Sequence, residues 1–418
     1  MKMKFRASVA VSLLYLALAI LPVAGMVFHA PDVTIHGWWT IWERPKLTTM
    51  FVPKENFPMK FERWFDQNLG FRGVATYADN TILYHVFRET KPGAPVKRGL
   101  SGMLINDEDT IYFSKDHIDL PKEERILDLA ERIDRMQKRL AKNGSALIPL
   151  IIPSKSTMYP ELVAPAWKRD LGMPRPSDVH VYETLRDDLR RRGTSFVDAR
   201  ELFLEQKEPQ LHSLVPQPKD KRHLLWGLDA RHWTFFGACL AVQKVMLKYT
   251  EMTGIAQKPH ECHLRMMDDA PPWYDDYDLT ELMNVWGVPY TAKQVPRADH
   301  PETKVDPKLQ ANVPSLLIVG TSFNWIVLKD TEAANAVKDV HFIYYNRTVV
   351  TWPSGKQVTL DAKSELWRRA ALGKQLYLLD LYESYIPVDY AFWFLADLEK
   401  ALDEGQVAPP PLPEEPRK

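Results

Sequence analysis

Three short and largely apolar runs constrain the fold of this chain more than any other feature of its sequence. They cover residues 146–152 (ALIPLII), 316–319 (LLIV) and 376–382 (LYLLDLY). Runs of this length with few polar residues are typical of strands that are buried on both faces. Residues 340–345 form a further expected strand, so the chain is predicted to hold an extended, covered sheet.

Amphipathic segments alternate with these strands. Over 122–143 apolar side chains recur three or four positions apart, and Gly144 then supplies a stop. A second helix is predicted over 177–193, and a short strand over 194–198 follows it. Further helices are expected over 234–250, 279–286, 331–337 and 363–372. Alternating helices and buried strands predict an α/β fold, a three-layer α/β/α sandwich with a mostly parallel sheet.

The N-terminal segment predicts export. Lys2, Lys4 and Arg6 precede an apolar run over 7–28 that contains no charged residue. Such a run is long enough to cross a hydrocarbon core of about 30 Å as a helix, with its basic flank on the cytoplasmic side. We therefore predict an uncleaved signal anchor over 1–30, which places the rest of the chain outside the cytoplasm. A cleaved signal peptide is the alternative.

Composition divides the remainder of the chain. Residues 31–60 are rich in Pro and Trp and predict a stalk or a wrapping segment, and 61–402 carry the helix and strand pattern of the main domain. Within that domain, 254–312 are rich in Asp and Pro, as expected of a lid or a binding loop. Residues 403–418 are rich in Pro and Glu and are expected to be a disordered tail.

Charge and cysteine content exclude several classes of protein. Lys plus Arg and Asp plus Glu both number 54, and no dense basic run argues for binding to nucleic acid. Only Cys239 and Cys262 are present, and they can pair in an oxidising compartment, although the sequence leaves this open. The stretch His260-Glu-Cys-His263 has no second Cys/His pair at a ligand-like spacing. We therefore expect neither a metal site nor a cofactor.

The candidate nucleophile is Ser322. It ends the segment Gly320-Thr-Ser, which directly follows one of the apolar strands and precedes a plausible helix start. The turn after such a strand is where α/β proteins place reacting groups. Taken alone, the pattern is more often an ordinary turn with a helix-capping hydroxyl than a catalytic serine.

A second motif, Asp229-Ala-Arg-His232-Trp233, supplies the groups that an active serine needs. A serine hydroxyl requires a base that removes its proton, and a histidine base requires a partner that fixes its orientation. His232 and Asp229 lie at the start of a predicted helix and can share one side of a turn. If the motif stands alone, Asp229 is expected to cap the helix, and His232 is expected to be a surface or packed histidine. Together with Ser322, the pair favours a Ser322–His232–Asp229 triad.

These motifs carry a family resemblance. Asp-x-x-His and Gly-x-Ser are signatures of SGNH hydrolases, in which the serine normally comes first, whereas here the Asp/His pair precedes it. In this permuted order the chain resembles the SGNH-like domain of the alginate O-acetyltransferase family (AlgJ and AlgX). The segments that carry the resemblance are Phe61–Arg72, Gly99–Leu104, Ile151–Pro160, His232-Trp233 and Val319–Ser322. The family usually reads Asp-x-His-Trp, and Ala230 stands two residues before His232 here, so Asp229 is expected to orient His232 from one residue further back.

The resemblance implies acetyl transfer in the periplasm by a protein anchored to the inner membrane. Ser322 would accept an acetyl group from a membrane O-acyltransferase and pass it to a hydroxyl of an exopolysaccharide such as alginate. His232 would act as base and then as acid. The backbone N–H of Ser322 and the side chain of Asn346 are candidates for stabilising the oxyanion.

Three tryptophans near the expected triad are candidates for contact with sugar rings, because flat aromatic faces suit them. They are Trp226, Trp233 and Trp325. Packing in the core is the alternative role for each. Two alternative functions remain for the chain: an esterase that uses the same triad with water as acceptor, and a non-catalytic scaffold of an exopolysaccharide assembly complex.

Overall fold

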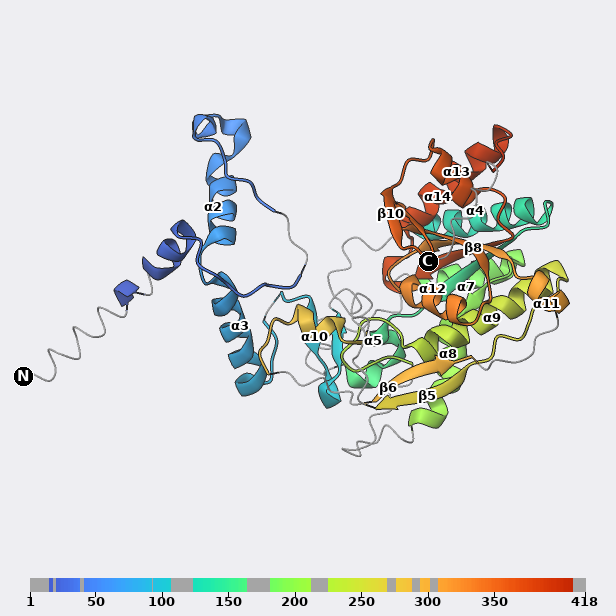
Figure 1. Cartoon of the computed structure of the whole chain (residues 1–418), viewed down its shortest axis with the longest axis horizontal. Coiled ribbons are helices and arrows are strands. Elements are labelled where there is room, and N and C mark those ends of the chain that lie inside the picture. The colour runs from blue at the N-terminus through green and yellow to red at the C-terminus, as the bar shows by residue number, and fades with distance from the viewer. Residues whose placement is uncertain are drawn as a thin grey trace, which may run out of the picture. The chain divides into compact units, whose positions relative to one another are not determined.

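A computed structural model describes most of the chain (Figure 1). The described residues are 15–17, 20–37, 41–91, 93–106, 123–163, 181–211, 225–268, 276–287, 294–300 and 307–408. The chain divides into two compact units, Met1–Arg98 with Leu279–Pro289, and Gly99–Asp278 with Tyr290–Lys418. The residues of the expected tail from 409 onward lie outside the described part of the chain.

A seven-stranded sheet forms the centre of the second unit, with the strand order β10-β9-β8-β7-β11-β3-β4. The strands are β3 Ala146–Ile152, β4 Val197–Asp198, β7 Ser315–Gly320, β8 Lys338–Tyr344, β9 Thr348–Thr351, β10 Lys356–Thr359 and β11 Leu376–Tyr382. Strands β8, β7, β11, β3 and β4 are parallel neighbours, while β9 and β10 add an antiparallel edge. The sheet is therefore mixed, and its parallel part contains all the apolar runs that predicted strands.

Helices cover both faces of this sheet. On β3, Ile148 and Leu150 pack into one core cluster, and Leu147 and Ile151 pack into another, because successive side chains of a strand point to opposite faces. The first cluster includes residues of α8 Ala199–Leu211, α9 Phe235–Thr253 and α12 Asn324–Ala333. The second includes residues of α4 Glu123–Ala141, α7 Val181–Arg192, α13 Glu365–Ala371 and α14 Asp389–Asp403. The α/β prediction is confirmed, with three layers.

Smaller elements lie outside the central sheet. They are α5 Lys155–Met158, α10 Asp278–Leu282, α11 Pro307–Ala311, the antiparallel pair β5 His263–Asp268 and β6 Gln294–Asp299, and the short strands β1 Val96–Arg98 and β2 Leu104–Asn106. In the first unit, α2 Phe57–Asn68 and α3 Arg72–Ile82 follow one another, and a π-helical turn over Leu83–Phe87 extends α3.

Two predicted elements differ from the structure. A helix was expected over 331–337, but α12 spans Asn324–Ala333 and the chain leaves it at Asn335, whose φ of 46° is left-handed. Residues 254–312 were expected to be loop-rich, yet they contain the paired strands β5 and β6. Their pairing was missed because the two strands are separated by a long connection and neither has a clean alternation of apolar residues.

Residues 20–27 form a helix within the first unit. The Gly70 N–H donates to the Pro22 carbonyl at 2.9 Å. A Cβ on Gly70 would lie 2.6 Å from the Gly25 backbone, so this close approach requires glycine. Residues 1–14 of the expected anchor lie outside the described residues. In the described part of the chain, no helix combines the length and apolarity needed to cross a membrane.

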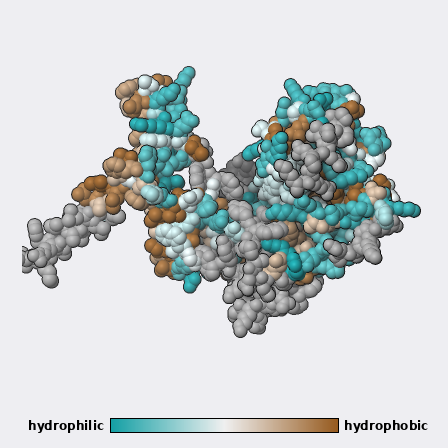
Figure 2. All heavy atoms as spheres, viewed as in Figure 1, coloured by the Kyte–Doolittle hydropathy of each residue, from teal (hydrophilic) through white to brown (hydrophobic). Residues whose placement is uncertain are grey.

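Exposed apolar side chains are numerous in this first unit. Leu21 is 53% exposed, Phe28 is 81% exposed and Phe51 is 90% exposed. Figure 2 shows hydrophobic surface on this part of the chain. Exposed apolar patches in soluble regions mark surfaces that contact other molecules.

A buried carboxylate holds the turn that follows β7. Asp380 Oδ2 on β11 accepts hydrogen bonds from Thr321 N at 2.7 Å, from Thr321 Oγ1 at 2.6 Å and from Asn324 Nδ2 at 2.7 Å. A Cβ on Gly320 would lie 2.3 Å from Asp380 Cβ, so the close approach of the two strands here requires glycine. Burial raises the pKa of Asp380 to about 6, although these hydrogen bonds oppose the shift. One side chain therefore binds residues on both sides of residue 322.

This pKa predicts a pH-dependent stability. Because the folded-state pKa of about 6 is above the ordinary 3.8, the folded protein holds this proton more tightly than the unfolded chain does. The stabilisation is fully present below the unfolded pKa and is lost as the pH rises through the folded pKa. Relative to Asp380→Asn, the free energy of unfolding of the wild type should fall by about 2–3 kcal/mol between about pH 4 and pH 7. Urea denaturation of both proteins across this range measures it, and a difference that does not change with pH would contradict the assignment.

Candidate active site

The structure brings Ser322 and His232 together. His232 Nε2 lies 2.8 Å from Ser322 Oγ, although the two residues are 90 positions apart in the chain. Ser322 lies in the turn between β7 and α12, and His232 lies in the loop before α9. The imidazole is 7% exposed, and the Phe323 ring packs edge-on against it at 4.9 Å. A base at this distance can accept the proton of the serine hydroxyl directly.

Two buried tryptophans hold the loop that carries His232. Trp226 and Trp233 pair as an isolated antiparallel bridge, and they are 0% and 1% exposed. Trp233 Nε1 donates to the Phe323 carbonyl at 3.1 Å, so it joins the histidine loop to the serine turn. Trp226 Nε1 donates to the Arg231 carbonyl at 3.2 Å. Because neither ring reaches the surface, these two side chains support the site and do not offer a face to a sugar ring.

The carboxylate beside His232 is that of Asp278, which corrects the prediction of Asp229. Asp278 Oδ2 lies 3.0 Å from His232 Nδ1, an ion-pair distance, although the contact lacks the alignment of a hydrogen bond. Asp278 Oδ1 accepts the Arg231 N–H at 2.8 Å. Asp278 therefore binds two consecutive residues of the loop and takes the position that orients the imidazole. Asp229 is 3% exposed, in the same loop.

A buried lysine fixes the part of the loop that contains Asp229. Lys155 Nζ donates to the Leu228 carbonyl at 2.9 Å and to the Ala230 carbonyl at 2.7 Å. Lys155 is 0% exposed and begins α5, directly after β3. The carbonyls on both sides of Asp229 are thus bound to an ammonium group. The segment Ile151–Pro160 therefore supports the histidine loop through the hydrogen bonds of Lys155.

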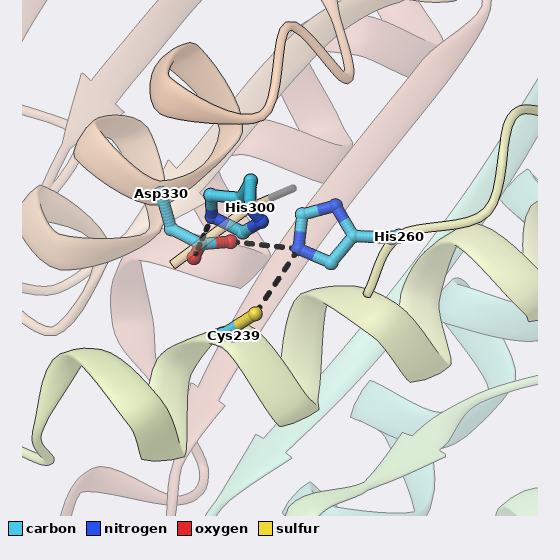
Figure 3. A group of neighbouring side chains, drawn as sticks. All are labelled: Cys239, His260, His300 and Asp330. Carbon is cyan, nitrogen blue, oxygen red and sulfur yellow. Dashed lines mark hydrogen bonds and ion pairs between the residues drawn. The ribbon is translucent and has the colours of Figure 1, made fainter. Parts of the chain in front are cut away.

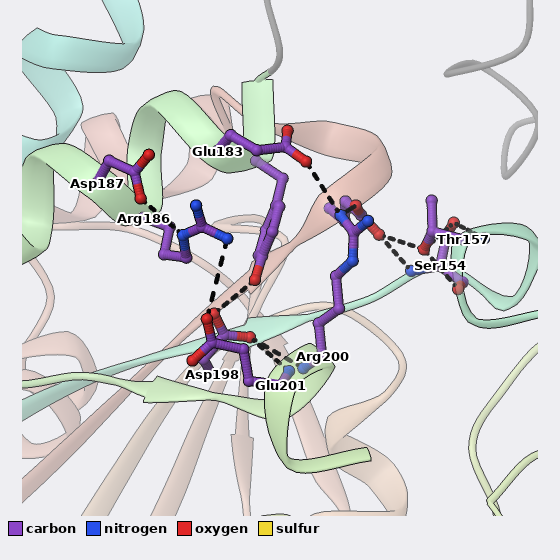
Figure 4. A network of polar contacts seen from close by, with 10 residues as sticks. Ser154, Thr157, Glu183, Arg186, Asp187, Asp198, Arg200 and Glu201 are labelled. Atoms are coloured by element: carbon purple, nitrogen blue, oxygen red, sulfur yellow. Dashed lines mark hydrogen bonds and ion pairs between the residues drawn. The ribbon is translucent and has the colours of Figure 1, made fainter. Parts of the chain in front are cut away.

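A fully buried glutamate, Glu383, anchors the same segment, and Figure 4 shows its partners Ser154, Thr157 and Arg200. Glu383 Oε2 accepts from Ser154 N at 2.8 Å and from Thr157 Oγ1 at 2.6 Å, and Arg200 Nη1 donates to Glu383 Oε1 at 2.8 Å. Burial raises the pKa of Glu383, and the charge of Arg200 opposes this shift. The chain after β3 is therefore tied to the chain after β11, and both lie at the carboxyl edge of the sheet.

Tyr345, which sequence reasoning missed, lies beside Ser322. Tyr345 and Asn346 have φ values of 48° and 53°, and Arg347 N donates to the Tyr344 carbonyl at 2.9 Å, which closes a tight turn between β8 and β9. A left-handed tyrosine is uncommon, and such strained residues cluster at functional sites. Tyr345 N donates to the Gly320 carbonyl at 2.9 Å. Burial raises the pKa of Tyr345, while the charge of Arg231 and a contact with Ser322 oppose this shift.

Asn346 and Trp325 take positions that differ in their relation to the site. Asn346 is the second residue of the tight β8–β9 turn, and no contact between its amide and Ser322 is present among the described residues. Trp325, on α12, is half-buried and packs against Phe342 at 5.3 Å and Tyr344 at 5.7 Å between ring centroids. Asn346 therefore lies in the turn beside Tyr345, and Trp325 packs mainly against the core.

An aromatic pocket of about 450 Å³ adjoins this site. Tyr345 and Tyr385 form part of its lining, and Arg231 Nη2 donates to Tyr385 Oη at 3.1 Å. Trp393 is 51% exposed at the pocket. The remaining lining residues are Arg347, Pro387, Val388, Asp389 and Tyr390. The pocket therefore extends from the neighbours of His232 and Ser322 to solvent-exposed aromatic surface.

Comparison with known proteins identifies relatives of this chain. Residues 108–331 match the family model described as "SGNH hydrolase-like domain, acetyltransferase AlgX", which covers more than half of the chain. The chain is 25% identical over 187 residues to the probable alginate O-acetylase AlgJ of Pseudomonas aeruginosa, covering 44% of this chain and 40% of that protein. It is 22% identical over 227 residues to the protein of the same name from Azotobacter vinelandii, covering 54% and 50%. The chain thus spans half or less of the length of these relatives.

A solved structure is also similar. The O-acetyltransferase domain of Pseudomonas putida AlgJ matches with a TM-score of 0.44 and 18% sequence identity, covering 73% of this chain and 99% of that chain. The family model includes both His232 and Ser322 in its matched range. Since that model covers more than half of the sequence, the chain belongs to the AlgJ/AlgX-like alginate O-acetyltransferase family and carries its SGNH hydrolase-like domain.

Proposed function

We propose that this chain moves an acetyl group through an acyl-serine at Ser322 onto hydroxyls of an exopolysaccharide such as alginate. The observation that carries the proposal is the 2.8 Å contact between His232 Nε2 and Ser322 Oγ. Membership of a family whose relatives are named probable alginate O-acetylases supports the reaction class. The same contact argues against a non-catalytic scaffold, because packing alone does not require a nucleophile and a base at this distance.

In the first half reaction, His232 takes the proton of Ser322 as Oγ attacks the carbonyl carbon of the acetyl donor. Asp278 Oδ2, at 3.0 Å from Nδ1, stabilises the imidazolium that forms. The histidine then gives the proton to the leaving group, and the acyl-serine remains. In the second half reaction, His232 accepts the proton of a sugar hydroxyl as that oxygen attacks the acyl carbon, and it returns the proton to Ser322 Oγ.

Each tetrahedral intermediate carries an oxyanion that needs donors. The backbone N–H of Ser322 at the start of the α12 turn is one candidate, and the Asn346 amide is another. The Tyr345 hydroxyl is a third, because it lies in contact with Ser322 and stays protonated when its pKa is raised by burial. These groups come from the two loops that follow the parallel strands β7 and β8.

The aromatic pocket supports a sugar acceptor over water. It is large enough for about one to two sugar rings, and it joins exposed aromatic surface at Trp393 to Tyr345 beside Ser322. Aromatic faces bind sugar rings, whereas hydrolysis requires no binding site for the attacking water. Transfer is therefore favoured over the esterase alternative.

The proposal includes a location outside the cytoplasm, with an anchor in the inner membrane and an acetyl-donating membrane O-acyltransferase as partner. Lys2, Lys4 and Arg6 before an uncharged run support it. The exposed apolar side chains of the first unit supply surface for such contacts. The permuted order of the motifs, with the histidine before the serine, fits the same family.

The central test traps the acyl-enzyme. The purified protein, incubated with an activated acetyl ester and examined by intact mass, should gain one acetyl group, and peptide mapping should place it on Ser322. Ser322→Ala should remain unlabelled, because it lacks the attacking oxygen. Labelling of Ser322→Ala at the wild-type rate would show that the serine is not the nucleophile.

A matched pair of variants tests the orienting carboxylate. Asp278→Asn should slow acyl-enzyme formation on the order of 10²- to 10⁴-fold, because the imidazolium loses the charge that stabilises it. Asp229→Asn removes the aspartate of the His232 loop itself and should have a much smaller effect. Stopped-flow release of the ester's leaving group measures both rates. A larger loss in Asp229→Asn would return the orienting role to Asp229.

The pocket is tested by separating the two half reactions. Trp393→Ala should raise KM for an oligosaccharide acceptor on the order of 3- to 10-fold and leave acyl-enzyme formation from a small ester unchanged. Trp286→Ala is the control, because it removes an exposed tryptophan that does not line the pocket. Equal acceptor KM values in the wild type and Trp393→Ala would remove the pocket from the acceptor site.

A further inference from the structure

Four side chains with metal-ligating atoms converge away from the serine site (Figure 3). They are Cys239 on α9, His260 before β5, His300 after β6 and Asp330 on α12. One ligand atom from each lies within 4.8 Å of the others. The side chains of His260 and Asp330 are 2% and 0% exposed, and that of His300 is 11% exposed. The cluster is therefore buried, and its members come from four separate elements.

The spacing of these atoms resembles the edges of a coordination shell. His260 Nε2 lies 2.9 Å from Asp330 Oδ2, His300 Nε2 lies 3.0 Å from Asp330 Oδ1, and Cys239 Sγ lies 3.5 Å from His260 Nε2. Tetrahedral zinc has bonds of about 2.0–2.3 Å, which place neighbouring ligand atoms about 3.3–3.7 Å apart. Movements of the ligand atoms by a few tenths of an ångström thus bring them to the separations found between neighbouring zinc ligands.

His300 is already oriented as a metal ligand would be. Its Nδ1 donates to the Glu261 carbonyl at 3.0 Å, while its Nε2 faces Asp330. Histidines that bind metals usually donate their other ring N–H to a carbonyl or carboxylate, which fixes the ring and the tautomer. This orientation does not depend on the presence of Cys239 and is a separate indication of a site.

Cys239 is bonded to Cys262 in the structure. Its sulfur is a thiolate ligand only after that disulfide is reduced. We propose that Cys239, His260, His300 and Asp330 form a zinc site that is an alternative to the Cys239–Cys262 disulfide. The site goes beyond acetyl transfer and does not rest on it.

No sequence pattern predicted this ligand set. The sequence drew attention to His260-Glu-Cys-His263, but His263 is exposed and contacts Glu261 at 3.2 Å, away from the cluster. His300 and Asp330 lie 40 and 70 residues after His260, too far for any ligand spacing rule. The packing of α9 against α12 and the pairing of β5 with β6 bring the four together.

The exchange balances in atoms and charge. A phosphine reductant takes the oxygen of one water to become a phosphine oxide, and the S–S bond accepts two electrons and two protons to give two thiols. Both ring nitrogens of His300 face acceptors in the structure, so both carry protons there. On binding zinc, Cys239 and His300 each release one proton to solvent. The four groups carry zero net charge before zinc binds. After the two protons have left, zinc and the four groups together again carry zero net charge.

The disulfide form is the weaker binder. It offers only His260, His300 and Asp330 as ligands. Only His300 would release a proton when Zn²⁺ brings two positive charges, so a net charge of +1 would be buried. Buried uncompensated charge is costly, and structural zinc sites are closed by four ligands. At His260 the bond to zinc takes the place of the contact between Nε2 and Asp330 Oδ2, and the ring proton moves to Nδ1.

The test uses two variants that both lack the disulfide. Cys262→Ser retains the Cys239 thiol, and Cys239→Ser removes it. With Co²⁺ as a spectroscopic probe and Zn²⁺ in competition, Cys262→Ser should bind one metal per full-length chain, with a thiolate-to-cobalt charge-transfer band and tetrahedral ligand-field bands. Cys239→Ser should lack the charge-transfer band and bind zinc at least about 10-fold more weakly. His300→Ala in the Cys262→Ser background should also lose binding.

Wild-type protein supplies an independent measurement. Oxidised wild type should bind zinc at least about 10-fold more weakly than phosphine-treated wild type, and zinc should raise the Tm of the reduced form. This arm holds even where a cysteine variant fails to fold by circular dichroism. Equal zinc affinities for Cys262→Ser and Cys239→Ser, or for oxidised and reduced wild type, would overturn the proposal, as would the absence of binding in the reduced protein.

Discussion

The hydrogen bonds to Asp380 are the interaction on which the catalytic geometry depends most. One buried oxygen accepts two bonds from Thr321 and one from Asn324, so the residues on both sides of Ser322 and Phe323 are held to β11. Gly320 allows this approach because it has no Cβ. Burying a carboxylate costs free energy, as its raised pKa shows. This unfavourable burial occurs at the turn that must hold the nucleophile in place.

Buried charged groups also hold the loop that carries His232. Lys155 binds two loop carbonyls, Glu383 binds the segment that carries Lys155, and Asp278 binds the backbone and the side chain of consecutive loop residues. Each of these charged groups is almost fully buried and is paired with hydrogen-bond partners. Paired buried charges contribute little net stability, but an alternative loop conformation would leave them unpaired. The network therefore selects one conformation of the loop.

Sequence reasoning succeeded where the signal is local. The runs 146–152 and 376–382 coincide with β3 and β11, because a strand with apolar side chains on both faces is stable where both faces are buried. His232 and Ser322 each follow or precede a regular element, and their types and positions were enough to pair them. The expected helix over 331–337 was misplaced because the sequence there does not reveal that Asn335 adopts a left-handed conformation.

Asp278 and Tyr345 were missed because their roles depend on packing between distant segments. Asp278 lies 46 residues after His232, in a stretch whose composition suggested only a loop, and Asp229 stood closer in sequence. Tyr345 is one of several aromatics in the stretch 340–345 that was predicted as a strand, and nothing in its residue type indicates the turn that directs it to Ser322. Proximity in sequence was therefore a poor guide to the carboxylate, whereas the position of Ser322 directly after an apolar strand was a good guide to the nucleophile.

The serine site and the cluster around Asp330 share two helices. His232 precedes α9, which carries Cys239, and Ser322 precedes α12, which carries Asp330. Both helices pack into one hydrophobic cluster against the same face of the sheet. His260 joins the two helices, since it contacts Cys239 on one and Asp330 on the other. The 2.8 Å contact at the start of these helices thus depends on how they pack, and the side chains around Asp330 fix that packing at a second point along their length.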